Sequence, residues 1–412
     1  MSVAARPLGK DITVAGLVGL AHFASHFFQL VLPSLILFLK ADFAVQYTAL
    51  GLLPTLLYGT SGLAQTPAGF LVDRFGARRV LLSGLTLLSL ATMATALAEA
   101  YWVLLPLAVL AGLGNSVFPP ADLSILTSRI DPQRLGRAYG AHALCGNLGW
   151  AAAPILMVGI AHLYDWRAAV VVAGMIGLSI VALFLILGQD MAEEAEPAGP
   201  EGAGAAETVS ILRNLRLLLS PNIVSCFLYF CFLAAALIGV QTFGPSAMTA
   251  LYDLPVDTAA LALTVFLVCS ATGVLIGAIA ADRTDRHDLI AICGMACAAI
   301  LVLPIALGLT PGLLIMVALG AAGIASGMTT PSRDMLVRAA TPRGASGRVF
   351  GFVYSGLDLG STAMPVCVGW MMDHGRPDGV FITVCAMLFL TMGTVLLVRA
   401  NTAPAAAVKS RA

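Results

Sequence analysis

A short stretch near the N-terminus carries two histidines and a glutamine at spacings that suit a helix. His22, His26 and Gln29 are separated by four and then three residues, so on a helix their side chains share one face. The surrounding residues are apolar, and ionisable groups in such a span are costly without a function or a partner. His22 lies about 15 Å into the apolar run at the helical rise. We predict a polar stripe that binds a solute or protons; alternatively, these histidines only hydrogen-bond to neighbouring helices.

A second candidate is a carboxylate in the middle of an apolar run. Asp358 lies well inside the run 346–371, and Tyr354 precedes it by one helical turn on the same face. A carboxylate surrounded by low dielectric can bind and release a proton near neutral pH. We therefore predict that Asp358 couples transport to protons, and keep open that it pairs with an arginine near the end of its span.

Charged residues at the ends of apolar runs suggest a different role. We expect Asp122 to pair with Arg74 or Arg78, and Asp334 with Arg283 or Arg286, in ion pairs that latch one conformation. Arg333 either snorkels to the membrane interface or faces a cavity, where it would favour an anionic solute. Further cavity candidates are Asn115, His142, Asn147 and Gln241.

The composition shows which elements must position these side chains. Hydrophobic residues make up 59% of the chain and charged residues 11%, whereas soluble domains carry about 25% charged residues. Membrane-spanning helices need about 20 apolar residues each. Twelve such runs can be read, near 13–39, 48–71, 80–99, 102–126, 138–161, 168–188, 222–247, 258–281, 288–308, 312–335, 346–371 and 379–399. The predicted fold class is an all-α membrane protein with twelve transmembrane helices.

The loops between these runs are sorted by charge. Lysine and arginine gather on one side, while only Lys40, Arg167 and Arg376 fall on the other. Cytoplasmic loops carry the excess of Lys and Arg. Both termini are therefore expected in the cytoplasm of a bacterial-type inner (plasma) membrane.

The chain also repeats itself. Residues 112–154 align without a gap on 323–365, so that Gly112, Pro120 and Pro154 fall on Gly323, Pro331 and Pro365. Half-length repeats in apolar chains are typical of secondary transporters with a substrate site between the halves. We predict two pseudo-symmetric six-helix bundles at 1–188 and 221–400, an acidic linker with an amphipathic helix at 189–220, and a disordered tail at 401–412.

A motif between the second and third runs names a family. Gly69-Phe-Leu-Val-Asp73-Arg74-Phe-Gly76-Ala-Arg78-Arg79 resembles the G-x-L-x-D-R-x-G-R-R signature of the major facilitator superfamily. Gly69 would let two helices approach closely, and Gly76 would permit a tight turn. The second half carries a partial copy that includes Asp282, Arg283 and Arg286. Phe118-Pro119-Pro120 and Gly146-Asn147 further resemble the fosmidomycin-resistance branch.

The resemblance implies alternating access around a central cavity and a monomeric protein. We expect a secondary transporter that moves a small polar or anionic organic solute, driven by protons, and no enzymatic activity, because no Walker loop, HExxH or GxSxG motif is found. Neither a cofactor nor a metal site is predicted, and the partners are the solute, protons and the lipid bilayer, without nucleic acid. The alternatives are a multidrug/proton efflux antiporter, a metal-ion transporter that uses His22 and His26, and a non-transporting membrane sensor.

Overall fold

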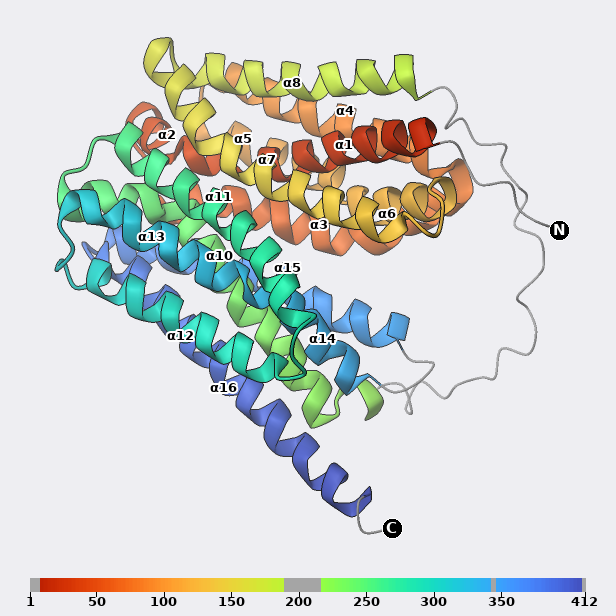
Figure 1. The fold of residues 1–412 in the computed structure, drawn as a ribbon. Helices are drawn as coiled ribbons and strands as arrows, with labels where there is room; N and C mark the ends of the chain where they lie inside the picture. The colour runs from red at the N-terminus through yellow and green to blue at the C-terminus, as the bar shows by residue number, and fades with distance from the viewer. Residues whose placement is uncertain (1–7, 189–215, 342–345, 410–412) are drawn as a thin grey trace.

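The computed structural model describes residues 8–188, 216–341 and 346–409. All regular secondary structure in these ranges is helical. In Figure 1 the helices of the first half of the chain, coloured red to yellow-green, lie above those of the second half, coloured green to blue.

Residues 8–188 of the first half contain nine helical elements. They are α1 (Leu8–Ser34), α2 (Ile36–Phe43), α3 (Tyr47–Phe75), α4 (Ala77–Ala94), the 3-10 turn η1 (Thr95–Leu97), α5 (Tyr101–Asn115), α6 (Phe118–Arg129), α7 (Leu135–Leu163) and α8 (Trp166–Leu187). The described part of the second half contains α10 (Pro221–Tyr252), α11 (Val256–Ala281), α12 (His287–Ala306), α13 (Gly312–Gly327), α14 (Thr329–Ala340), α15 (Ser346–Asp373) and α16 (Asp378–Lys409).

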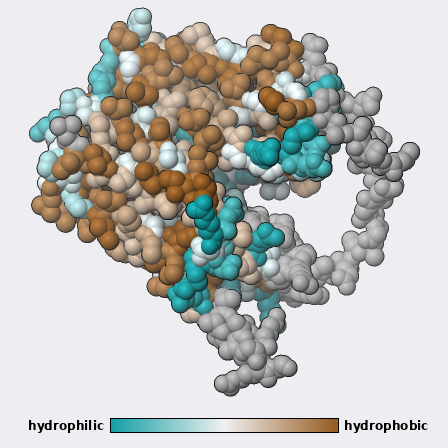
Figure 2. Space-filling model, in the orientation of Figure 1, coloured by the Kyte–Doolittle hydropathy of each residue, from teal (hydrophilic) through white to brown (hydrophobic). Residues whose placement is uncertain are grey.

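Apolar composition and length identify a multi-pass membrane protein. Within the described residues, 10 segments are long and apolar enough to cross a membrane. Large apolar side chains lie exposed on the outside, among them Trp102, Ile300 and Val317, and brown apolar residues cover much of the face in Figure 2. Such a surface suits lipid rather than water.

Two long helices, α3 and α15, fall outside those 10 segments. The predicted runs 48–71 and 346–371 lie on these two helices. Both carry polar and charged residues, and they pack against each other. The partner helix, rather than lipid, therefore surrounds part of their polar surface.

Three of the predicted single runs are broken in the structure. A break at Leu35 follows Pro33 and separates α1 from α2, and further breaks separate α5 from α6 and α13 from α14. Pro119 and Pro331 lie in the first turns of α6 and α14. Proline has no amide hydrogen to donate, so it fits the first turn of a helix, where that donor would have no partner within the helix.

The predicted boundary at residue 400 is wrong. The last helix, α16, continues to Lys409, because the Ala-rich sequence beyond residue 400 has a high intrinsic helix propensity. Most of the predicted acidic linker, 189–215, lies outside the described residues.

The sequence repeat reappears as a repeat of helix packing. In the first half α1 packs on α7, α3 on α5 and α4 on α8; in the second half the equivalent pairs are α10 with α15, α11 with α13 and α12 with α16. The halves meet through α3 with α15 and α7 with α11, which the repeat also relates to each other. The repeat therefore governs contacts between the halves as well as within them.

Contacts between α3 and α15 run along only part of their length. Added Cβ atoms on Gly369 and Gly51 would lie 2.6 Å from the Tyr47 carbonyl oxygen and 2.5 Å from the Pro365 carbonyl oxygen. The series continues through Thr55, whose hydroxyl donates to the Thr362 carbonyl at 2.7 Å, and through Gly62 beside Asp358. The two helices therefore cross closely from the start of α3 to its middle.

Candidate functional site

The first half of the chain holds three histidines in contact with one another, His22 and His26 on α1 and His142 on α7. The rings of His22 and His142 stack with centroids 3.6 Å apart, and those of His22 and His26 are 4.4 Å apart. We call these three residues the histidine stack. The indole of Trp150 continues it, stacked on His26 at 4.1 Å.

A carboxylate lies at one end of the histidine stack. Asp122 of α6 is fully buried, and its Oδ2 lies 3.0 Å from His142 Nε2 and 3.2 Å from His22 Nδ1. The contact with His142 is a hydrogen bond, so an ionised Asp122 places the His142 proton on Nε2. His22 Nδ1 lies nearby without hydrogen-bond geometry.

These contacts correct the prediction that Asp122 pairs with Arg74 or Arg78. Its ion-pair partners among the described residues are the two histidines. Arg78 instead donates to the Phe184 carbonyl oxygen at 3.4 Å. Asp122 lies between packed helices and contacts imidazoles, which are far less costly to bury than guanidinium groups.

Glycine makes room for the stack. A Cβ at Gly146 would lie 2.7 Å from His22 Cδ2 and 2.8 Å from His26 Cε1. No larger residue would leave the two imidazoles in place against α7, so Gly146 belongs to the site.

Gln29 connects the stack to α3. Its Oε1 accepts from the Trp150 indole N–H at 2.9 Å and from the Tyr58 hydroxyl at 3.4 Å. The predicted stripe His22, His26 and Gln29 therefore forms one polar system.

The other amide candidates have different surroundings. Asn115 accepts from the Ser25 hydroxyl at 2.7 Å and donates to the Ser61 hydroxyl at 3.0 Å, so it ties α5 to α1 and α3. Asn147 donates to the Ala143 carbonyl of its own helix. Gln241 is buried in α10. These amides are not brought to the histidine stack.

The second half contains its own polar cluster. The Arg333 guanidinium donates to Asp334 Oδ1 at 3.0 Å and lies over the Phe230 ring at 4.4 Å. The Tyr354 hydroxyl donates to the same Asp334 oxygen at 3.2 Å. Asp334 thus pairs with its neighbour, not with Arg283 or Arg286 as predicted; Arg286 pairs with Asp288 at 3.2 Å.

Asp358 of α15 lies against Gly62 of α3. An added Cβ at Gly62 would be 3.0 Å from Asp358 Cβ and 3.4 Å from its Oδ2. Within the described residues its carboxylate has no hydrogen-bond or ion-pair partner. The predicted arginine partner is therefore not found there, and a carboxylate without a cation suits reversible protonation.

The two glycines of the signature motif have different surroundings. Gly76 follows α3 with a φ of 88°, which confirms the predicted tight turn. A Cβ at Gly69 would meet nothing within 4 Å, so the predicted close approach is absent in this conformation. Asp73, Arg74 and Arg79 are exposed, while Asp282 ends α11 and Arg283 follows it; no ion pair joins these residues to Asp122 or Asp334.

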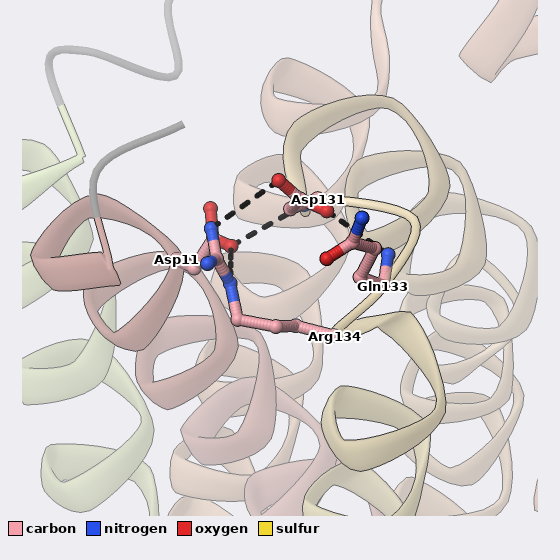
Figure 3. A network of polar contacts seen from close by, with 4 residues as sticks. All are labelled: Asp11, Asp131, Gln133 and Arg134. Carbon is pink, nitrogen blue, oxygen red and sulfur yellow. Dashed lines mark hydrogen bonds and ion pairs between the residues drawn. The ribbon is translucent and has the colours of Figure 1, made fainter. Parts of the chain in front are cut away.

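Sequence reasoning missed an ion-pair cluster at the same end of the first half. Figure 3 shows Arg134 and Asp131, from the connection between α6 and α7, directed at Asp11 of α1. The Arg134 Nε donates to Asp11 Oδ2 at 2.7 Å, and the Asp131 amide reaches the same oxygen at 3.3 Å. Asp11 lies outside the predicted run 13–39, which is why the pattern gave no signal.

Sequence reasoning also missed a contact between the halves at the opposite end. The Asp373 carboxylate, at the end of α15, accepts from the Tyr47 amide at 2.7 Å, the Thr48 amide at 2.8 Å and the Thr48 hydroxyl at 2.6 Å. It caps the first turn of α3, which has no side-chain cap from Gln46. His162 of α7 and Asp257 of α11 form a second ion pair between the halves at 2.9 Å.

The family can now be stated from a comparison with known proteins. The model of the Major Facilitator Superfamily matches residues 18–255 and 236–412. The chain belongs to the Major Facilitator Superfamily. This confirms the resemblance predicted from the motif between α3 and α4.

Curated relatives of this superfamily member have diverse names. Multidrug resistance protein MdtG of Enterobacter lignolyticus is 26% identical over 396 residues, which cover 92% of this chain and 90% of that protein. Membrane sensor protein UhpC of Escherichia coli is 24% identical over 64% of this chain and 62% of that protein. Multidrug resistance protein B homolog of Mycobacterium tuberculosis is 31% identical, but the match spans only 22% of its length.

Solved structures show the same fold. A bacterial homolog of the human lysosomal transporter Spinster, in an inward-facing and occupied conformation, superposes with a TM-score of 0.76 at 14% identity, covering 96% of this chain and 98% of that one. A mutant of the nucleoside transporter NupG gives 0.73 at 12% identity over 93% and 99%. At these identities the likeness shows the fold alone.

Proposed function

We propose that this protein is a secondary transporter that moves a small polar or anionic organic solute across the inner membrane by alternating access, coupled to protons. The observation that carries this proposal is the position of Asp358, which lies against Gly62 of α3 and has no cation partner among the described residues. The two sequence repeats would act as two six-helix bundles, with all twelve predicted spans crossing the membrane.

The contacts between the halves support one state of such a cycle. Asp373, Gly51 and Thr55 hold the halves together at one end, while the motif charges Asp73 and Arg74 at the other end are exposed. If Lys and Arg mark the cytoplasmic side, the termini and the separated end face the cytoplasm, and this is an inward-facing state.

The charge of the solute is the finer part of the proposal. Arg333 would favour an anion, but it is already paired with Asp334 and stacked on Phe230. An anionic group of the solute would therefore have to share the Arg333 guanidinium with the Asp334 carboxylate or displace that carboxylate. The Tyr354 hydroxyl, on the same oxygen, offers a neutral donor beside it.

A multidrug/proton efflux antiporter is the second candidate. The similarity to MdtG over 92% of the chain favours it, as does Asp122, a buried carboxylate whose ion-pair partners are histidines alone among the described residues. This candidate would take cationic solutes, whereas the first would take anionic ones.

Ligand-dependent thermal stability of the purified protein separates the two. A ligand that binds only the folded state raises the melting temperature by mass action. Stabilisation by organic anions, lost in Arg333→Ala and retained in the surface control Arg376→Ala, supports the leading proposal. Stabilisation by organic cations instead, lost in Asp122→Asn, supports the antiporter. Hits are then tested for uptake or efflux in proteoliposomes with an imposed pH gradient; no gradient-driven transport of any stabilising ligand would refute both.

A further inference from the structure

Asp122 is a buried carboxylate that is not repeated in the second half and does not belong to the signature motif. Its side chain has no exposed surface, and its Oδ1 has no hydrogen-bond partner among the described residues. The equivalent position in the second half, 211 residues later, is Arg333. The carboxylate is therefore not needed to build the repeated helix packing.

The groups that face Asp122 leave its charge uncompensated. The histidine stack approaches from α1 and α7, and Cys145 of α7 packs on Gly19. Tyr58 of α3 is joined to the stack through Gln29 and Trp150. Arg78 of α4 is bonded to the Phe184 carbonyl. With neutral imidazoles, Asp122 and the histidine stack together carry one negative charge, and a single added proton makes them neutral.

We infer that Asp122, His142 and His22 act as one proton-binding unit, which would be the proton-coupling site of the first half of the transporter. This inference rests on the proposed function for its role in transport, but not for the binding of the proton. The proton is shared between the carboxylate and an imidazole, because both rings lie within 3.2 Å of one carboxylate oxygen. Burial of an uncompensated charge is costly, and the proton removes that cost.

His26 extends the histidine stack away from Asp122. His26 lies between His22 and Trp150, with ring centroids 4.4 Å and 4.1 Å away. Its Nδ1 is buried and has no partner among the described residues. No hydrogen bond joins His26 to the other two rings among the described residues, so the primary proton-binding unit is limited to Asp122, His142 and His22.

His22, Asp122 and His142 could also be considered as ligands of a metal ion. One donor atom from each of His22, Asp122 and His142 lies within 4.8 Å of the others. Metal-bound imidazoles hold the ion near their ring planes, with Zn–N bonds of about 2.0–2.1 Å. The rings of His22 and His142 are stacked at 3.6 Å with planes 23° apart. An ion shared between them would lie up to roughly 1.8 Å out of each ring plane, a displacement almost as large as the Zn–N bond itself. The stacking therefore favours a proton over a metal ion.

The test is a pH titration of the full chain in nanodiscs, without solute or gradient. Histidine labelled with ¹³C and ¹⁵N reports the six His side chains by NMR, and His162 and His374, exposed on other parts of the molecule, serve as internal references. We expect the signals of the histidine stack to shift together in one step, with uptake of about one proton per protein, as strongly interacting sites do. Asp122→Asn should remove this step. The control Asp334→Asn, in the corresponding turn of the second half, should preserve it.

Three results would overturn the inference. The three signals of the stack could titrate independently, the step could persist in Asp122→Asn, or micromolar Zn²⁺ could shift all three signals of the wild type and raise its melting temperature. The wild-type titration tests the first and third of these results even if Asp122→Asn does not fold. His142→Gln, which keeps an amide donor, is the second variant. A one-proton step without any driven transport would refute the proposed function alone. Driven transport without the step would refute the proton-binding unit alone.

Discussion

At the scale of single residues, Asp358 is the carboxylate to which the proposed function assigns proton coupling. It lies against Gly62 of α3 and has no cation partner among the described residues. We expect Asp358→Asn to fold normally, because the amide has the same shape, and to lose transport driven by a pH gradient. Proteoliposome uptake with and without the gradient measures this. Unchanged driven transport would remove Asp358 from the coupling mechanism; Ser355→Ala, on an exposed face of the same helix, is the control.

The Arg333 cluster allows a graded test of stability. Tyr354→Phe removes one hydrogen bond to Asp334, which should cost about 0.5–1.5 kcal/mol. Asp334→Asn leaves the buried Arg333 guanidinium without its carboxylate, and should cost about 1–3 kcal/mol. Thermal or denaturant unfolding in detergent should therefore rank Asp334→Asn as the more destabilising. The opposite order would show that Asp334 is not the main partner of Arg333.

Residue identity allowed part of this site to be predicted. Helical spacing placed His22, His26 and Gln29 on one face, and in the structure their side chains are linked through ring stacking and through Trp150. The predicted partners of Asp122 and Asp334 were wrong, because the true partners depend on which helices pack together. His142 lies 20 residues from Asp122 in sequence, and nothing in the local pattern brings the two residues together.

At the scale of elements, glycines control how closely α3 approaches α15. A Cβ at Gly51 would lie 2.5 Å from the Pro365 carbonyl oxygen, whereas one at Gly69, further along the same helix, would meet nothing within 4 Å. We expect Gly51→Ala to cost about 1–3 kcal/mol in this conformation, as overpacking does, and Gly69→Ala to cost far less. Melting temperatures of the two variants test this difference. Equal effects would indicate that Gly69 is closely packed in the state that dominates in solution.

The Asp373 cap is a contact between elements of different halves. Its carboxylate accepts from two amides and a hydroxyl in the first turn of α3, where a negative charge is also favoured by the helix dipole. We expect Asp373→Asn to favour the alternate state and to speed hydrogen exchange at the Tyr47 and Thr48 amides by about tenfold or more, which corresponds to about 1.4 kcal/mol. Hydrogen–deuterium exchange of the peptide containing Tyr47 measures this directly.

A matched control lies in the next connection. Asp378 pairs locally with Arg376 at 2.8 Å, and no hydrogen bond or ion pair joins it to α3 among the described residues, so Asp378→Asn should leave exchange at Tyr47 unchanged. If both variants behave alike, the cap does not hold the halves together. Sequence reasoning could not have found this cap, because Asp373 caps a helix that begins more than 300 residues earlier.

At the scale of the whole molecule, the repeat explains why the halves meet as they do. It pairs α3 with α11 and α7 with α15, and the structure uses these helices for the two most extensive contacts between the halves. The sequence predicted the positions of the helices well, because long apolar runs are a strong signal. It could not predict the breaks after α5 and α13 within single runs, because a helix that ends before a proline and restarts keeps the same apolar composition.

If the protein works by alternating access as proposed, the contact between α3 and α15 must open and close once per cycle. The Thr55 hydroxyl reaches the Thr362 carbonyl oxygen at 2.7 Å across this contact. A covalent link between cysteines at these two positions should therefore hold the halves in the present state. We expect the double variant Thr55→Cys with Thr362→Cys to lose transport after treatment with an oxidant or a short bifunctional thiol reagent, and an oxidised pair to recover after reduction. Each single variant carries the same eight native cysteines and should keep its activity under the same treatment. Thermal shift with a stabilising solute should still detect binding in the linked protein, because the separated end remains open. Full transport in the linked protein would mean that the two halves do not separate at α3 and α15, and that solute crosses by another movement.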